Sequence, residues 1–217
     1  MPTRPAVVAE IRQLAPAVVH LTISLSDPPF EFHPGQWVNF RFPEGVSRAY
    51  MIASPPEQPQ VLELCVRIGN GKGGMALRKL TSGSEVTIDG PFGNFVLPDD
   101  GSRGVVFLAG DTGIAPVRSI VLHMLAVKDS RPVTVLYEPD RRNILYAADF
   151  DPLARGGAIV HESGNIELLM SRNRHTIADS VVMAAGFDGF LSRCTNSLKD
   201  FGVTEGNVLV ESFGPEP

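Results

Sequence analysis

The feature that most constrains the fold is a change in the spacing of apolar residues near residue 100. Before this point apolar and polar residues alternate, as in residues 19–25 and 62–68, which is typical of strands with one buried face. After it, residues 105–109 are continuously apolar, as expected of a strand buried on both faces of a parallel sheet. The sequence therefore predicts two domains of different class.

The first half is predicted to form a small antiparallel β-barrel of the Greek-key type over residues 1–98. Turn-forming segments such as Asp27-Pro28-Pro29 separate short alternating stretches, which is the pattern of an all-β domain. A barrel closes on itself and so leaves few exposed strand edges. The six predicted strands are residues 6–12, 19–25, 37–42, 48–53, 62–68 and 85–89.

The second half is predicted to form an α/β domain with a parallel sheet over residues 103–217, after a polar linker at residues 98–102. Apolar residues recur at helical spacing from Val117 to Leu125 and lie between two strand candidates, which makes a βαβ unit. A second such unit is predicted near the C-terminus. The predicted elements are strands at 105–109, 133–137, 181–184 and 208–210 and helices at 117–125 and 187–201.

Composition narrows the function. Lys and Arg total 19 against 24 Asp and Glu, a net charge of −5, and no basic run is present, so nucleic acid is not an expected partner. No apolar stretch approaches the roughly 18 residues of a membrane span, and the N-terminus lacks signal-peptide features, so we expect a soluble, cytoplasmic protein. With only Cys65 and Cys194 and scattered histidines, no disulfide framework, iron–sulfur cluster or protein-bound metal is expected.

The segment Gly110-Asp111-Thr112-Gly113 lies between the buried strand and its helix. Glycines allow close backbone approach, and N–H groups at a helix start favour an anion, so a dinucleotide pyrophosphate fits this place. A tight strand-to-helix turn explains the same residues equally well.

Two further segments suit a nucleotide. Arg48 and Tyr50 share one face of a strand, which suits a ligand with phosphates and a flat ring, although an exposed Arg beside a half-buried Tyr is common on barrels. The glycine-rich stretch at residues 69–74 would cradle phosphate oxygens at a helix start or form a flexible hairpin loop.

Taken together and in order, these motifs resemble the ferredoxin–NADP reductase superfamily over nearly the whole chain. His33-Pro34-Gly35-Gln36-Trp37-Val38 is similar to the family's pGQyv segment, Arg48-Ala49-Tyr50-Met51 to its R-x-Y-[ST] motif and Gly71-Lys72-Gly73-Gly74-Met75 to its phosphate loop. Gly90-Pro91-Phe92-Gly93-Asn94-Phe95 is similar to GPfG.F, residues 108–116 to aGGTGIaP and Glu211-Ser212-Phe213 to the E.F ending.

The resemblance implies that the barrel binds FAD and that the second domain binds NADH or NADPH. Arg48 would bind the flavin phosphates, and Tyr50 would lie against the isoalloxazine ring. The backbone of residues 65–68 would hold the ring's pyrimidine edge, and the loop with Met75 N–H would receive the pyrophosphate. Tyr50 and Thr112 are the expected catalytic residues. The expected cofactor-binding residues are Arg48, Ala49, Tyr50, Met51, Cys65, Val66, Arg67, Gly73, Gly74, Met75, Gly110, Thr112, Gly113 and Phe213.

The chain departs from the family pattern at several positions. Met51 stands where Ser or Thr is usual, Met75 stands where Ser is frequent, and Ala185-Gly186-Phe187 replaces a common Cys-Gly-Pro. Residues 161–180 also form a short nicotinamide lobe. These departures bear on hydride transfer more than on flavin binding.

Three functions are compatible with this pattern. The first is an FAD-dependent NAD(P)H oxidoreductase that passes electrons to a separate acceptor protein, such as a ferredoxin-like carrier or an oxygenase component. The second is a free-flavin reductase, and the third is a flavin-binding relay subunit or sensor with an impaired nicotinamide site.

The preference between NADH and NADPH stays open. Arginines near residues 141 and 173 would suit a 2′-phosphate, acidic residues near 138 would suit a ribose diol, and plain surface charge is a third interpretation. The residues concerned are Arg141, Arg142, Arg172, Arg174, Glu138 and Asp140.

Overall fold

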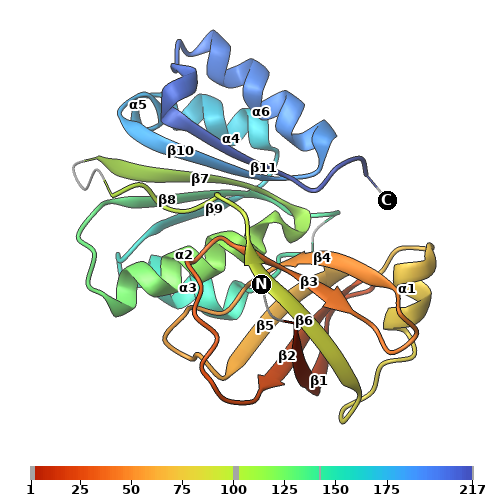
Figure 1. The fold of residues 1–217 in the computed structure, drawn as a ribbon. Coiled ribbons are helices and arrows are strands. Elements are labelled where there is room, and N and C mark those ends of the chain that lie inside the picture. Colours follow the sequence, from red (N-terminus) through yellow and green to blue (C-terminus); the bar gives the residue numbers. More distant parts are fainter. Residues whose placement is uncertain (1–2, 100–102, 142, 217) are drawn as a thin grey trace. The chain divides into compact units, whose positions relative to one another are not determined.

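The computed structural model describes residues 3–99, 103–141 and 143–216 and divides the chain into two compact units (Figure 1). The first unit comprises the chain up to Leu97 together with Arg118–Lys128. The second comprises Pro98–Val117 and Asp129–Glu216. Most of helix α2 (Ile114–Ala126), which follows the Gly110 segment, therefore belongs to the first unit.

The first unit is an antiparallel six-stranded sheet that curls into a barrel, as predicted. Its strands follow the order β4-β3-β6-β1-β2-β5. An isolated bridge between Ile52, directly after β4, and Leu64, in the middle of β5, links the two outer strands and so closes the barrel. The elements are β1 (Arg4–Ala15), β2 (Val18–Leu25), β3 (Trp37–Arg41), β4 (Ser47–Met51), β5 (Val61–Arg67), α1 (Lys72–Leu77) and β6 (Glu85–Phe92).

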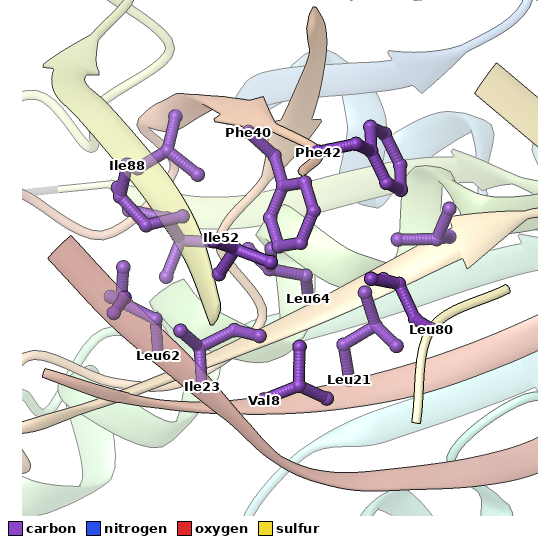
Figure 2. Packing of buried hydrophobic residues seen from close by; sticks show 14 of the residues in the cluster. Val8, Leu21, Ile23, Phe40, Phe42, Ile52, Leu62, Leu64, Leu80 and Ile88 are labelled. Carbon is purple, nitrogen blue, oxygen red and sulfur yellow. The ribbon is translucent and has the colours of Figure 1, made fainter. Parts of the chain in front are cut away.

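The barrel core follows directly from the alternation of residues along the strands. Leu21 and Ile23 on β2 are completely buried, whereas Thr22 and Ser24, which alternate with them, are not. Apolar side chains from other strands meet them inside the barrel, among them Phe40 of β3 and Leu64 of β5 (Figure 2). Burying each such side chain stabilises the fold by on the order of 1.5–3 kcal/mol. This core therefore holds the sheet in its curled form, which sets the positions of β4 and β5.

The second unit is a five-stranded parallel sheet in the order β11-β10-β7-β8-β9. Helices α4 and α6 lie on one face of this sheet and α3 lies on the other (Figure 1). The continuous apolar run forms a buried strand of this parallel sheet, as predicted, and this strand is the central one. The elements of this part of the chain, where α2 belongs mostly to the first unit, are β7 (Gly104–Gly110), the 3-10 turn η1 (Asp111–Gly113), α2 (Ile114–Ala126), β8 (Val133–Glu138), α3 (Ala147–Arg155), β9 (Val160–Ser163), α4 (Ile166–Arg172), α5 (Arg174–Ala178), β10 (Ser180–Gly186), α6 (Asp188–Asp200), the turn η2 (Glu205–Asn207) and β11 (Val208–Ser212).

Four elements of the second unit were not predicted: α3, β9, α4 and α5. Strand β9 has only four residues and lies at a sheet edge with Val160 half exposed, so it lacks both an apolar run and a clear alternation. Asn173 separates the two short helices α4 and α5, so neither is long enough to show a helical period. The short lobe predicted at residues 161–180 thus consists of the end of β9 and these two helices.

No helix in the described part of the chain is long and apolar enough to cross a membrane.

Candidate functional site

Strand β4 directs Arg48 and Tyr50 toward the interior face of the barrel. Arg48 is paired with Phe40 and Tyr50 with Val38 on β3, and paired residues of an antiparallel ladder point to the same face. Phe40 and Val38 are completely buried in the core. The Tyr50 ring lies 5.9 Å from the Phe40 ring, while Arg48, nearer the start of the strand, stays exposed.

The environment of Tyr50 limits its chemistry. Burial raises the pKa of its hydroxyl to about 12, against the opposing charge of Arg48. The phenol is therefore protonated at neutral pH, so it offers a flat ring and a hydrogen-bond donor but no base.

The glycine-rich loop meets Arg48. A Cβ atom added to Gly73 would lie 2.8 Å from Arg48 Nε and 3.0 Å from its Cγ. The Arg48 side chain thus runs directly over Gly73, and its Nη1 donates a hydrogen bond to the Ser47 carbonyl at 2.7 Å. The structure brings together two of the predicted phosphate-binding positions, which are 25 residues apart in sequence.

Gly74 and Met75 have other roles in this loop. A Cβ on Gly74 would lie 1.8 Å from the Gly69 carbonyl oxygen, so this glycine lets the loop close on itself. The Met75 N–H, which was expected to face the pyrophosphate, donates to the Gly71 carbonyl at 3.0 Å and closes the first turn of α1. The N–H groups of the preceding three residues are the ones that a helix start leaves without intrahelical acceptors.

The end of β5 supplies the third part of the site. Ala53 N–H donates to the Glu63 carbonyl at 2.7 Å, so the backbone groups of Glu63 point away from β2. Residues two apart in an antiparallel strand direct their backbone groups to the same side, which places those of Cys65 and Arg67 along this edge. The side chains of Cys65 and Val66 are buried and serve packing.

Ala49 and Met51 lie on the opposite face of β4 from Arg48 and Tyr50. Ala49 is exposed, and Met51 is only 7% exposed and is paired with Trp37. The Met51 side chain offers no hydroxyl to a ligand, and its thioether packs within the protein.

In the second unit the carboxyl ends of β7 and β10 form a topological switch point. The chain passes from β7 to β8 on one side and returns to β10 on the other, and ligands of open α/β sheets bind outside the strand ends at such a point. Gly110, Thr112 and Gly113, all buried, follow β7 at this place. The structure therefore sets these predicted residues where a dinucleotide would bind.

The glycines of this motif are also needed for packing against β10 and α6. A Cβ on Gly113 would lie 2.0 Å from the Ala185 carbonyl oxygen, and one on Gly110 would lie 2.5 Å from Phe190 Cγ. Asp111 adopts a left-handed φ of 51°, a conformation that Asp tolerates better than most residues.

Phe213 lies beside the same strand end. Its N–H donates to the Gly186 carbonyl at 3.0 Å, and its ring meets the Phe187 ring edge-on, with centroids 5.8 Å apart. A second hydrogen bond, from Asp188 N–H to the Gly214 carbonyl at 3.0 Å, also holds the C-terminal segment at this place. Phe187 was not singled out as a site residue, and its one signal in the sequence is an aromatic residue placed directly before a helix start.

Glu138, at the carboxyl end of β8, is engaged by the protein itself. Its carboxylate accepts hydrogen bonds from Ile166 N–H at 2.7 Å and from both terminal nitrogens of Arg193. Burial opposes ionisation, but these hydrogen bonds outweigh it and lower the Glu138 pKa. Glu138 therefore holds α4 and α6 to the sheet. Arg141 is exposed, and Arg142 lies outside the described residues.

Comparison with known proteins identifies the class of the first domain. The family of oxidoreductase FAD-binding domains matches residues 5–97. The reductase component of phenol 2-monooxygenase from Pseudomonas sp. strain CF600 is 33% identical over 153 residues, which are 68% of this chain and 43% of that protein. Matches to curated relatives span 35% to 62% of their own lengths.

Two solved structures share the fold of the whole chain. The cytochrome P450 reductase GcoB of Amycolatopsis has a TM-score of 0.87 at 24% identity, covering 99% of this chain and 71% of the other. A ferredoxin–NADP+ reductase of Neisseria gonorrhoeae with bound FAD and NADP has a TM-score of 0.84 at 18% identity, covering 98% and 99%.

The barrel followed by a parallel α/β unit is thus the fold of flavin-dependent reductases with two domains. Residues 5–97 thus match the family of oxidoreductase FAD-binding domains, and the chain shares the fold of a ferredoxin–NADP+ reductase.

Proposed function

We propose that this chain is an FAD-dependent NAD(P)H oxidoreductase that delivers electrons to a separate acceptor protein. The observation that carries the proposal is the convergence of Arg48, Tyr50 and Gly73 within the FAD-binding domain, where a guanidinium, a flat phenol ring and a glycine backbone meet.

These residues fit the parts of FAD one by one. The Arg48 guanidinium would bind a phosphate by charge-assisted hydrogen bonds. The Tyr50 ring would pack against the isoalloxazine. When bound, the flavin supplies the acceptance of a hydride from nicotinamide and the onward transfer of electrons.

The second unit would bind the nicotinamide dinucleotide at the switch point. Thr112 offers a hydroxyl there, and Phe187 with Phe213 forms an aromatic wall at the end of β10. Because Glu138 is already hydrogen-bonded by Ile166 and Arg193, we do not assign it to the ribose, and the choice between NADH and NADPH would depend on other residues.

The acceptor would be a ferredoxin-like carrier or an oxygenase component. Support comes from the relative named as the reductase component of phenol 2-monooxygenase, a name that implies a separate oxygenase component. We propose a cytoplasmic location because the NAD(P)H that the reaction consumes is held there.

A free-flavin reductase is the second candidate. It is favoured by the Ala185-Gly186 pair at the end of β10, because this pair resembles the one that free-flavin reductases of the superfamily have at this place.

Anaerobic mixing with NADH and with NADPH tests these alternatives. Bleaching of a flavin that stays bound through gel filtration supports the proposed function. A colourless protein that reduces added flavin catalytically supports the free-flavin reductase. A yellow protein that neither nucleotide bleaches would contradict both and point to a relay subunit.

A further inference from the structure

The packing of Arg48 over Gly73 gives this glycine a more specific role than phosphate contact. Arg48 Nε and Cγ lie 2.8 and 3.0 Å from where a Gly73 Cβ would be, and its Cδ lies at 3.3 Å. Three atoms of one side chain thus occupy the space that any other residue at position 73 would fill.

We propose that Gly73 is a positioning residue for Arg48: its missing side chain sets the path of the arginine, and so the point where the guanidinium meets the flavin phosphate. This inference rests on the proposed function, since it specifies how the phosphate of FAD is recognised.

The neighbouring glycines show that this role is particular to Gly73. The space at Gly74 is closed by the backbone oxygen of Gly69, 1.8 Å from an added Cβ, whereas a Cβ on Gly71 would meet nothing within 4 Å. Gly74 therefore serves the loop itself, Gly71 has no steric role, and only Gly73 is matched to a side chain from another strand.

Fixing the path of Arg48 matters because the residue is exposed. An exposed arginine samples many rotamers, and ordering it on binding reduces affinity. The groove over Gly73 and the hydrogen bond to the Ser47 carbonyl at 2.7 Å restrict the side chain before the cofactor arrives.

The effects of a Gly73→Ala substitution on folding and on binding should be separable. The atoms that clash belong to a flexible side chain, so Arg48 can move aside without backbone strain. Position 73 also lies in α1, where alanine is a better helix former than glycine. The substitution should therefore displace the guanidinium and leave the barrel folded.

A double-mutant cycle tests the proposal on the full chain. The dissociation constant for FAD is measured by flavin fluorescence for the wild type, Gly73→Ala, Arg48→Ala and the double variant, with thermal unfolding as the fold control. Lys79→Ala, which removes a cation paired with Glu44, controls for net charge, and Gly206→Ala, with nothing within 4 Å, controls for a glycine substitution elsewhere.

We expect Arg48→Ala to weaken FAD binding about 10- to 100-fold, the range given by lost charge-assisted hydrogen bonds. Gly73→Ala should weaken it about tenfold in the wild-type background and at most about twofold once Arg48 is absent. Equal losses in both backgrounds would show that Gly73 acts without Arg48, and an unchanged affinity in the wild-type background would also overturn the proposal. If the wild type itself binds no FAD, the proposed function is wrong. This outcome is distinguishable from failure of the Gly73 proposal, because the wild type is measured before any variant.

Discussion

Replacing Glu63 by glutamine should destabilise the first unit in a way that depends on pH. The Glu63 carboxylate lies between Arg118 and His20 of that unit. Arg118 Nη1 is 2.6 Å from Oε2, and His20 Nε2 is 3.6 Å from Oε1. Burial opposes ionisation of Glu63, but hydrogen bonding to His20 and the charge of Arg118 outweigh it and lower its pKa from 4.5 to about 2.

The size of the effect follows from linkage. A difference of about 2.5 pKa units at about 1.4 kcal/mol per unit corresponds to about 3.5 kcal/mol of stability. Because the folded pKa of Glu63 is depressed, this contribution is fully present above pH 4.5 and is lost as the pH falls toward 2. At pH 3 about 1.4 kcal/mol should remain.

Urea unfolding of the wild type and of Glu63→Gln at pH 7 and pH 3 measures this contribution. The single tryptophan, Trp37, lies on β3 of the same unit, so its fluorescence reports on this unit alone. Glu57→Gln is the matched control, because its partner is the half-exposed His123 and such pairs contribute at most about 1 kcal/mol. Equal unfolding free energies for the wild type and Glu63→Gln at pH 7, or a difference that does not shrink at pH 3, would refute the reasoning.

Three further substitutions have defined expectations. Gly113→Ala should cost about 1–3 kcal/mol, because its Cβ would collide with the Ala185 backbone, and a melting temperature within one degree of the wild type would contradict this. Glu138→Gln should lower the unfolding free energy by about 1–3 kcal/mol at pH 7, because the charged hydrogen bonds to Arg193 are lost. Urea titration followed by circular dichroism should show a smaller difference from the wild type in acid, because the wild-type carboxylate is then itself protonated. Phe40→Ala should cost about 3–5 kcal/mol, since this ring is completely buried, and unchanged tryptophan-detected unfolding would count against the barrel core described above.

Much of the fold could be predicted because its strands have distinct burial patterns. Strand β2 alternates because one face lines the barrel, and β7 is continuously apolar because helices cover both faces of its sheet. Strand β9 could not be predicted, since four residues at a half-exposed edge show neither pattern.

The candidate site was predictable only in part. The shared face of Arg48 and Tyr50 follows from the two-residue period of a strand. The approach of Arg48 to Gly73 does not, because it depends on how the barrel brings a strand and a distant loop together. The sequence likewise gives no sign that the Met75 N–H is used inside α1 or that Glu138 is bound by Arg193, since both depend on where helices begin and pack.

A structure of the protein crystallised with FAD tests the central claim most directly. We predict a phosphate oxygen about 3 Å from the Arg48 guanidinium, the distance of a charged hydrogen bond, and the isoalloxazine ring against Tyr50. A flavin bound elsewhere, with Arg48 still directed only to the Ser47 carbonyl, would contradict the account.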